Sequence, residues 1–290
     1  MSTSTDPAQP AAAAPTEHVL VVGEALVDVV HRADGSVAEH PGGSLANVAL
    51  TLGRLGRDAR LATWLGQDAR GEAVRAWLDD SAVTLTPGST DAPTTSVATA
   101  HLDAHGAATY EFDLEWRVPA GTAPDAGTLA VHTGSIAAVL EPGASDVRAL
   151  VAAARDTATI TYDPNARPAL MGDPADARTR IEALVALADV VKVSDEDVAW
   201  LVPGKDPVAV AREWLTLGPA LVVVTFGGEG AVAVTATGEQ RVTAPRVEVV
   251  DTVGAGDSFM GALLDGLWAA GLLGAARREA LRAIGASGLG

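Results

Sequence analysis

The stretch with the most chemical content runs from Asp251 to Phe259 and reads DTVGAGDSF. It follows a β-branched apolar run and precedes a long apolar run, so we expect it to join a strand to a helix. Gly254, Ala255 and Gly256 carry little or no side chain, so their backbone N–H groups can approach a ligand closely. Together with the unpaired N–H groups of a helix N-terminus, they are suited to bind an anion such as a transferring phosphoryl group.

Asp257 follows this turn and lies in the first turn of the expected helix. An anion repels a carboxylate beside its binding site, and general-base chemistry on an attacking hydroxyl is one reason for the carboxylate to be there. The plainer alternative is an Asp that caps the helix, which a lone Gly-Ala-Gly-Asp pattern would favour. A dinucleotide motif is disfavoured, because Phe259 stands where G-x-G-x-x-G needs its third glycine, and the sequence has no Walker P-loop.

Strands and helices alternate along most of the sequence. Strands are expected at 19–30, 60–66, 128–136, 159–165 and 189–194, with up to three more within 220–245. Helices are expected at 45–56, 71–80, 144–156, 177–188, 195–202 and 207–218, and a strand, a turn and a long helix within 248–271. The alternation predicts a mostly parallel sheet with helices on both faces, and ligands bound beyond the carboxyl ends of its strands.

Residues 94–113 break this alternation. They predict two strands around a turn at 103–106, which is a β-hairpin. The turn-rich segment 31–41 could supply an additional strand. Together these segments are expected to form a small β-sheet appended to the main domain.

Composition excludes several classes of function. The 290 residues are 48% hydrophobic, which suffices for one large α/β domain or two small ones. The net charge of −17 argues against sequence-independent binding to nucleic acid or to anionic membranes. The absence of cysteine excludes disulfides, thiolate metal sites and thiol nucleophiles.

The N-terminal segment 1–16 is rich in Ala, Pro, Ser and Thr, and we expect a disordered tail rather than a signal peptide. No apolar run is long enough to cross a membrane, so a cytoplasmic protein is expected. The six histidines lack metal-binding spacing, apart from His101 and His105 across the hairpin turn, which we interpret as solvated.

Two stretches resemble, in the right order, the two signatures of the ribokinase-like (PfkB-type) carbohydrate kinases. These are PGGSLANVALTLGRLG at 41–56 and DTVGAGDSF at 251–259. Shorter matches between them are GQD at 66–68, PTT at 93–95, DPN at 163–165, KVSDED at 192–197 and TFGGEG at 225–230. The resemblance covers roughly residues 19–285.

The resemblance implies a ribokinase-like α/β fold, a three-layer sandwich with a mostly parallel central sheet and a small β-sheet lid. The core is then expected to comprise 17–30, 42–92 and 119–290, and the lid 31–41 and 93–118. A lid that closes over the sugar would shield the phosphoryl acceptor from competing water.

The resemblance also implies ATP-dependent phosphorylation of a sugar hydroxyl, with Asp257 as catalytic base. The backbone of Gly254, Ala255 and Gly256 would form the anion hole. The implied substrate-binding residues are Asp28 and Asn47 as ligands of sugar hydroxyls, Gly42 and Gly43 as a hinge pair beneath the sugar, and Arg167 as a contact to phosphate or an acidic substrate.

Six residues match positions that relatives use for ATP: Asn165, Lys192, Ser194, Thr225, Gly227 and Gly230. Relatives carry an Asn-x-x-Glu motif linked to magnesium and phosphate, and this chain has Ser194-x-x-Asp197 instead. We therefore expect Asp197 to hold Mg²⁺ through water, with adjacent Glu196 as the alternative. Asp251 and Thr252 match a monovalent-cation site, which suggests K⁺.

The stretches GEALVDVV, DPNARP and KVSDED are most similar to fructokinase-type members, which makes fructose the expected substrate. The alternatives are ribokinase and 2-keto-3-deoxygluconate kinase, for which Arg117 or Arg167 would pair with a substrate carboxylate. Relatives usually continue with another alanine-rich helix, so weakened ATP binding or poor folding is expected here. A catalytically weak sugar-binding regulator is then the alternative from a different class. A homodimer formed through the lid is a further expectation.

Overall fold

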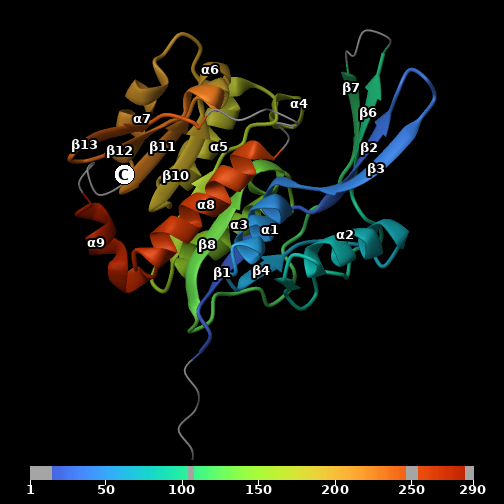
Figure 1. Ribbon diagram of the computed structural model, residues 1–290, viewed down its shortest axis with the longest axis horizontal. Coiled ribbons are helices and arrows are strands. Elements are labelled where there is room, and N and C mark those ends of the chain that lie inside the picture. The colour runs from blue at the N-terminus through green and yellow to red at the C-terminus, as the bar shows by residue number, and fades with distance from the viewer. Residues whose placement is uncertain (1–14, 104–107, 246–253, 285–290) are drawn as a thin grey trace, which may run out of the picture.

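The computed structural model describes residues 15–103, 108–245 and 254–284. Within these ranges a nine-stranded sheet has the order β13-β12-β11-β10-β9-β8-β1-β4-β5 (Figure 1). Its strands are β1 (His18–Val22), β4 (Ala59–Ala62), β5 (Val83–Leu85), β8 (Thr128–Gly134), β9 (Thr159–Asp163), β10 (Val190–Ser194), β11 (Leu221–Thr225), β12 (Ala231–Thr235) and β13 (Gly238–Val242). All pairings are parallel except β11 with β12 and β12 with β13.

The strand order reverses between β1 and β8, and this reversal distributes the helices over the two faces of the sheet. The helices are α1 (Ser44–Arg54), α2 (Ala69–Asp79), α3 (Gly143–Ala154), α4 (Pro168–Met171), α5 (Pro174–Val185), α6 (Asp195–Leu201), α7 (Pro207–Leu215), α8 (Ala255–Ala269) and α9 (Arg278–Arg282). Right-handed crossovers place α1 on one face and α3, α5 and α7 on the other. Helix α8 packs along α1, in front of the sheet in Figure 1. Ligands of such sheets bind near the point of reversal, at the carboxyl ends of the strands.

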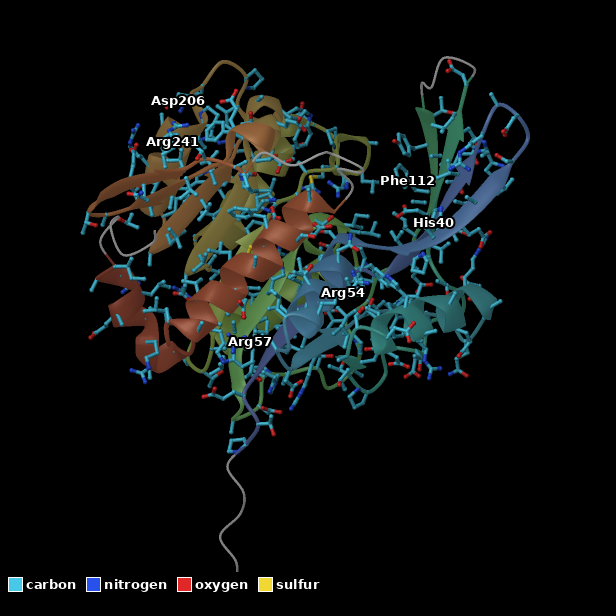
Figure 2. All side chains as sticks on the ribbon, viewed as in Figure 1. His40, Arg54, Arg57, Phe112, Asp206 and Arg241 are labelled. Carbon is cyan, nitrogen blue, oxygen red and sulfur yellow. The ribbon has the colours of Figure 1, made fainter. Side chains whose placement is uncertain are left out.

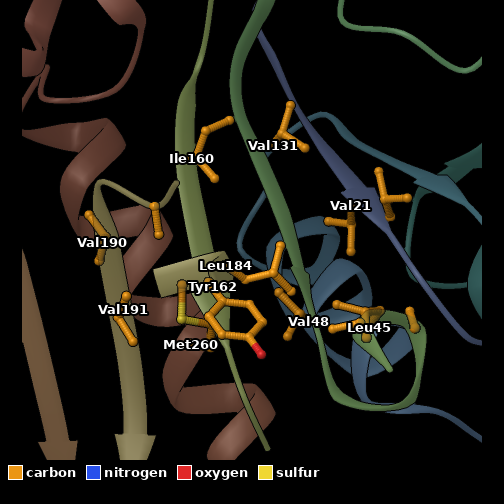
Figure 3. Packing of buried hydrophobic residues seen from close by; sticks show 14 of the residues in the cluster. Val21, Leu45, Val48, Val131, Ile160, Tyr162, Leu184, Val190, Val191 and Met260 are labelled. Carbon is orange, nitrogen blue, oxygen red and sulfur yellow. The ribbon is translucent and has the colours of Figure 1, made fainter. Parts of the chain in front are cut away.

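The core forms where both faces of the sheet meet the helices. Figure 3 shows Val48 of α1 and Met260 of α8 among the buried side chains, together with Ile160 and Tyr162 of β9 and Leu184 of α5. Because successive side chains of a strand point to opposite faces, the side chain of Tyr162 lies on one face of the sheet and that of Asp163 on the other. The expected mostly parallel sheet with flanking helices is confirmed.

A separate four-stranded sheet has the order β3-β2-β6-β7 and projects to one side of the molecule (Figure 1). It consists of β2 (Leu26–His31), β3 (Val37–Gly42), β6 (Val97–Leu102) and β7 (Ala108–Asp113). Strands β6 and β7 are the two expected within 94–113, and β3 is the additional strand expected near 31–41.

The prediction of one buried strand over 19–30 is wrong. Residues 18–22 pair in the large sheet, whereas residues 26–31 pair in the small one. The chain changes sheet at Gly23, where a Cβ atom would overlap the side chain of Leu45. β1 is buried and β2 half-buried, and both are rich in valine, so apolar residues stand on both sides of Gly23 and Glu24 and suggest one strand.

Other expected strands and helices differ only in their ends. The strand expected at 60–66 is β4, which ends at Ala62, and the one expected at 128–136 ends at Gly134 before a 3₁₀ turn over Ser135–Ala138. The strand expected before Gly254, and residues 1–14 of the expected tail, lie outside the described residues. Within the described ranges, no helix has the length and apolarity needed to cross a membrane.

Candidate active site

Asp257 lies where the N-termini of α1 and α8 meet. Helix α8 starts after Gly254, whose φ of 72° and ψ of 5° are in the left-handed region that favours glycine. The Asp257 side chain is only 5% exposed. Its Oδ1 accepts a hydrogen bond from Ser44 Oγ at 2.7 Å, and its Oδ2 accepts one from Asn47 Nδ2 at 2.8 Å. The two signature stretches therefore meet at one carboxylate.

Asn165 supplies a third donor from the loop after β9. Its Nδ2 donates to Asp257 Oδ1 at 3.0 Å and to Ser44 Oγ at 2.7 Å. All three partners of Asp257 are neutral donors; Oδ1 accepts two of these bonds and Oδ2 only one, so Oδ2 retains a lone pair for a further bond. The carboxylate is thus fixed in orientation and can still accept a proton.

Arg167 orients Asn165. Its Nη1 donates to Asn165 Oδ1 at 2.7 Å and to the backbone oxygen of Asn165 at 3.0 Å. With the Asn165 oxygen held by the guanidinium, the amide nitrogen points to Asp257. Asn165 itself has a φ of +36°, which the Arg167 clamp helps to maintain. The sequence had assigned Asn165 to ATP, whereas the structure brings it to the carboxylate of Asp257.

The predicted hinge glycines lie where β3 of the small sheet joins α1. Gly43 has a φ of 109°, and a Cβ atom there would lie 2.6 Å from the backbone oxygen of Glu24. A Cβ atom on Gly42 would overlap Oδ2 of Asp28, so this glycine makes room for the carboxylate. Burial raises the pKa of Asp28, while the positive charge of Arg167 opposes that rise. Four of the five predicted substrate residues therefore lie near one another: Asp28, Gly42, Gly43 and Arg167. The fifth, Asn47, is linked to Arg167 through Asp257 and Asn165.

Lys192 and Asp163 form a buried ion pair beneath the start of α8. The Lys192 Nζ lies 2.8 Å from Asp163 Oδ2, and both side chains are 3% exposed. Burial raises the pKa of Asp163 to about 6, although the ammonium opposes that rise. Lys192 was expected to contact ATP, and in the structure its ammonium binds Asp163.

Ser194 and Asp197 form a capping box at the N-terminus of α6. Ser194 Oγ accepts a bond from the Asp197 backbone N–H at 3.0 Å, and Asp197 Oδ2 accepts one from the Ser194 N–H at 3.4 Å. Asp197 Oδ1 also accepts the Ala166 N–H at 2.9 Å. Glu196 is exposed, so of the two carboxylates Asp197 is the one turned toward the site. In the described part of the chain no three His, Cys, Asp or Glu side chains are grouped for a metal.

Thr225, Gly227 and Gly230 lie at the carboxyl end of β11, beside the Ser194 end of β10. Gly227 has a φ of 50° and Gly230 a φ of 111°. A Cβ atom on Gly230 would overlap the backbone oxygen of Val242, so the tight turn alone requires this glycine. Asp251 and Thr252, predicted to bind a monovalent cation, lie outside the described residues.

Three functional candidates received no role from the sequence. Ser44 is three residues before Asn47 and therefore shares its helix face, a signal that could have identified it. Asp163 lies in the Asp-Pro-Asn match, where only Asn165 had been assigned. Glu24 is 6% exposed, and its Oε2 accepts the Ala137 N–H at 3.2 Å. Burial raises the pKa of Glu24 to about 7, and its place as an acid within an apolar run was its only sequence signal.

Comparison with known proteins extends these local observations. The family model described as "pfkB family carbohydrate kinase" matches residues 16–285. A fructokinase from Rhizobium leguminosarum bv. trifolii is 35% identical over 259 residues, which is 86% of this chain and 79% of the relative.

Two solved structures are also similar. Fructokinase with bound ATP from Xylella fastidiosa has a TM-score of 0.74 at 25% identity, covering 86% of this chain and 81% of that one. Aminoimidazole riboside kinase from Salmonella enterica, complexed with aminoimidazole riboside and an ATP analogue, has a TM-score of 0.70 at 28% identity. That match covers 86% of this chain and 84% of the other.

Proposed function

The chain belongs to the pfkB family of carbohydrate kinases, and on that premise we propose that it transfers the γ-phosphoryl group of ATP to a hydroxyl of fructose. Family membership and the carbohydrate-kinase activity expected from the two signatures are confirmed. The choice of ATP and fructose rests on what the similar proteins are named for.

One observation supports the mechanism above the others: Asp257 is held by three neutral donors at the N-terminus of α8. The sugar hydroxyl oxygen attacks the γ-phosphorus and the bond to the β,γ-bridging oxygen breaks, so ADP leaves. The hydroxyl proton passes to Asp257 as this happens. The backbone of Gly254, Ala255 and Gly256 would receive the charge that develops on the phosphoryl oxygens.

A divalent metal would complete the nucleotide site. Both Asp197 oxygens already accept backbone N–H groups, and the carboxylate keeps lone pairs for a water ligand of Mg²⁺. When bound, Mg²⁺ neutralises phosphate charge. Contacts of ATP with Ser194, Thr225 and Gly227 are part of this proposal, and K⁺ at Asp251 and Thr252 stays a prediction.

Fructose is proposed over an acidic sugar because the similar curated relatives are named fructokinases. Arg117 Nε donates to Glu115 Oε1 at 2.9 Å, and Arg167 Nη1 is bound to Asn165. Each guanidinium has five N–H donors, so an acidic sugar is included among the substrates to be tested. Asp28, with its carboxylate over Gly42, is suited to accept hydrogen bonds from neutral sugar hydroxyls.

The small sheet is proposed to act as a lid and also to form the contact between two copies of the chain. Asp28, Ala98 and Phe112 occupy paired register positions, so they share one face of the sheet. On that face Tyr110 and Phe112 are 61% and 37% exposed, and their rings stack at 6.2 Å. Phe112 lies on the side of the sheet that faces the core in Figure 2. An exposed aromatic pair of this kind suits burial by a second copy.

A coupled assay of ADP release tests the proposed function. Fructose, 2-keto-3-deoxygluconate, ribose and aminoimidazole riboside are each supplied with ATP and Mg²⁺. We expect the highest kcat/KM with fructose, and a loss on the order of 1000-fold in Asp257→Asn. If none of these sugars supports ADP release, the kinase proposal is refuted. If a sugar binds without turnover, the regulator is favoured. A higher kcat/KM with another sugar would refute fructose as the substrate.

A further inference from the structure

The ammonium of Lys192 lies against the first turn of α8. A Cβ atom built on Gly256 would be 2.9 Å from Lys192 Nζ and 3.9 Å from its Cε. Gly256 is the residue immediately before Asp257, so the ammonium lies behind the turn that carries the catalytic carboxylate. The space that a side chain at 256 would need is occupied by Lys192, which explains this glycine independently of any ligand.

This is an unfavourable place for a positive charge. Helix N-termini carry a partial positive charge, so a cation is destabilised there. Lys192 is also 3% exposed and has lost its hydration. The bond to Asp163 offsets these costs, but an apolar pair of similar volume often stabilises a core equally well. Stability therefore does not explain the ammonium, whereas a reaction that needs positive charge at this point does.

The charged groups around Lys192 come from four elements. Asp163 on β9, Asp197 on α6 and Asp257 on α8 are negative, and His132 on β8 is neutral because burial lowers its pKa to about 3. Burial alone would lower the pKa of Lys192, but the three carboxylates outweigh it and raise that pKa, so the amine stays charged. Without the ammonium, three carboxylates would face incoming phosphates with no buried cation among these groups.

We infer that Lys192 is a positioning residue for phosphoryl transfer: its ammonium, fixed by Asp163 behind the first turn of α8, strengthens the anion-binding turn and compensates the charge of Asp257. The inference rests on the proposed function and assigns Lys192 a role other than direct contact with ATP. Asp163 also accepts the Asn165 backbone N–H at 3.2 Å, so the effect of Lys192 is measured against an Asp163 variant and not only against wild type.

Two variants separate the charge of Lys192 from the packing of the pair. Asp163→Asn removes the carboxylate and keeps the lysine, which still faces Asp197 and Asp257, whereas the double variant D163N/K192M removes both charges and keeps the approximate volumes. Relative to D163N, we expect kcat of the double variant to fall on the order of 10- to 100-fold, less than for loss of a direct oxyanion donor. The KM for fructose is expected to change less than about 2-fold, because Lys192 acts where charge develops in the transition state.

The pH profile is the readout that a structural role would not move. Loss of a nearby cation makes the carboxylates of the site harder to ionise, so the acidic limb of kcat/KM should move to higher pH only in the double variant. Lys192→Gln, which can still donate to Asp163, should show the same shift relative to wild type, and it replaces the double variant if that protein does not fold.

Equal kcat and superimposable pH profiles for D163N and D163N/K192M would overturn the inference and make the pair structural. The same holds if Lys192→Gln, folded by circular dichroism, keeps the wild-type kcat and profile. A wild-type enzyme that phosphorylates no sugar would instead refute the proposed function, so the two failures are distinguishable.

Discussion

The contact between α1 and α8 can be tested with a single methyl group. Gly261 lies one turn after Asp257, and a Cβ atom there would be 2.7 Å from Cβ and Cγ2 of Thr51 on α1. Thr51 cannot easily rotate away, because its Oγ1 donates to the Asn47 backbone oxygen at 2.9 Å. Ordinary van der Waals contact starts near 3.4 Å, so Gly261→Ala must separate the helices locally by about 0.7 Å.

This separation has two measurable consequences. Overpacking should lower the free energy of unfolding by about 1–3 kcal/mol. Because α1 carries Ser44 and α8 carries Asp257, the hydrogen bonds between them lengthen, and kcat should fall on the order of 10-fold, since a misplacement of about 1 Å can cost roughly 100-fold.

Gly266→Ala is the matched control in the same helix. No atom lies within 4 Å of a Cβ built on Gly266, which is exposed, so alanine should stabilise the protein by about 0.5–1 kcal/mol and leave kcat unchanged. Urea denaturation and the ADP-release assay on both variants give the two numbers. If G261A proved as stable and as active as G266A, the tight α1–α8 contact and its role in placing Asp257 would be refuted.

Three further predictions concern the site itself. Gly42→Ala should displace the carboxylate of Asp28 and raise the KM for fructose on the order of 10-fold with little change in stability, and an unchanged KM would contradict that placement. Ser44→Ala removes one donor to Asp257 and should lower kcat about 10-fold in steady-state assays, which a wild-type kcat would disprove. The raised pKa of Glu24, about 7 instead of 4.5, means that the wild type loses up to about 3 kcal/mol of unfolding free energy as the pH rises from 4.5 through 7. Glu24→Gln should not show this loss. If urea denaturation gives the same change in the free energy of unfolding between pH 5 and pH 8 for both proteins, the raised pKa of Glu24 is contradicted.

Local sequence patterns predicted the architecture well where one pattern has one structural meaning. The Gly-Ala-Gly-Asp turn predicted a helix start, and α8 begins directly after Gly254. The apolar spacing over 45–56 predicted a helix, which is α1. The pattern failed at 19–30, because two buried strands in succession look like one when the chain changes sheet at a glycine.

The sequence by itself determined the family, because the two signatures can be identified without coordinates, and it singled out Asp257 as the predicted base. The tertiary structure decided which residues surround Asp257. Ser44, Asn47 and Asn165 lie 213, 210 and 92 positions from it, so only the packing of α1, β9 and α8 brings their donors to one carboxylate.

The structure likewise decided what Lys192 does. The family resemblance assigned Lys192 to ATP, but the position of β10 beside β9 directs it to Asp163 and beneath Gly256. The spacing of residues along the chain determines which of them share a face of one strand or helix, because the periodicity of strands and helices is local. Which buried charges become neighbours depends on the order of the strands, and that order is set only when the whole sheet forms.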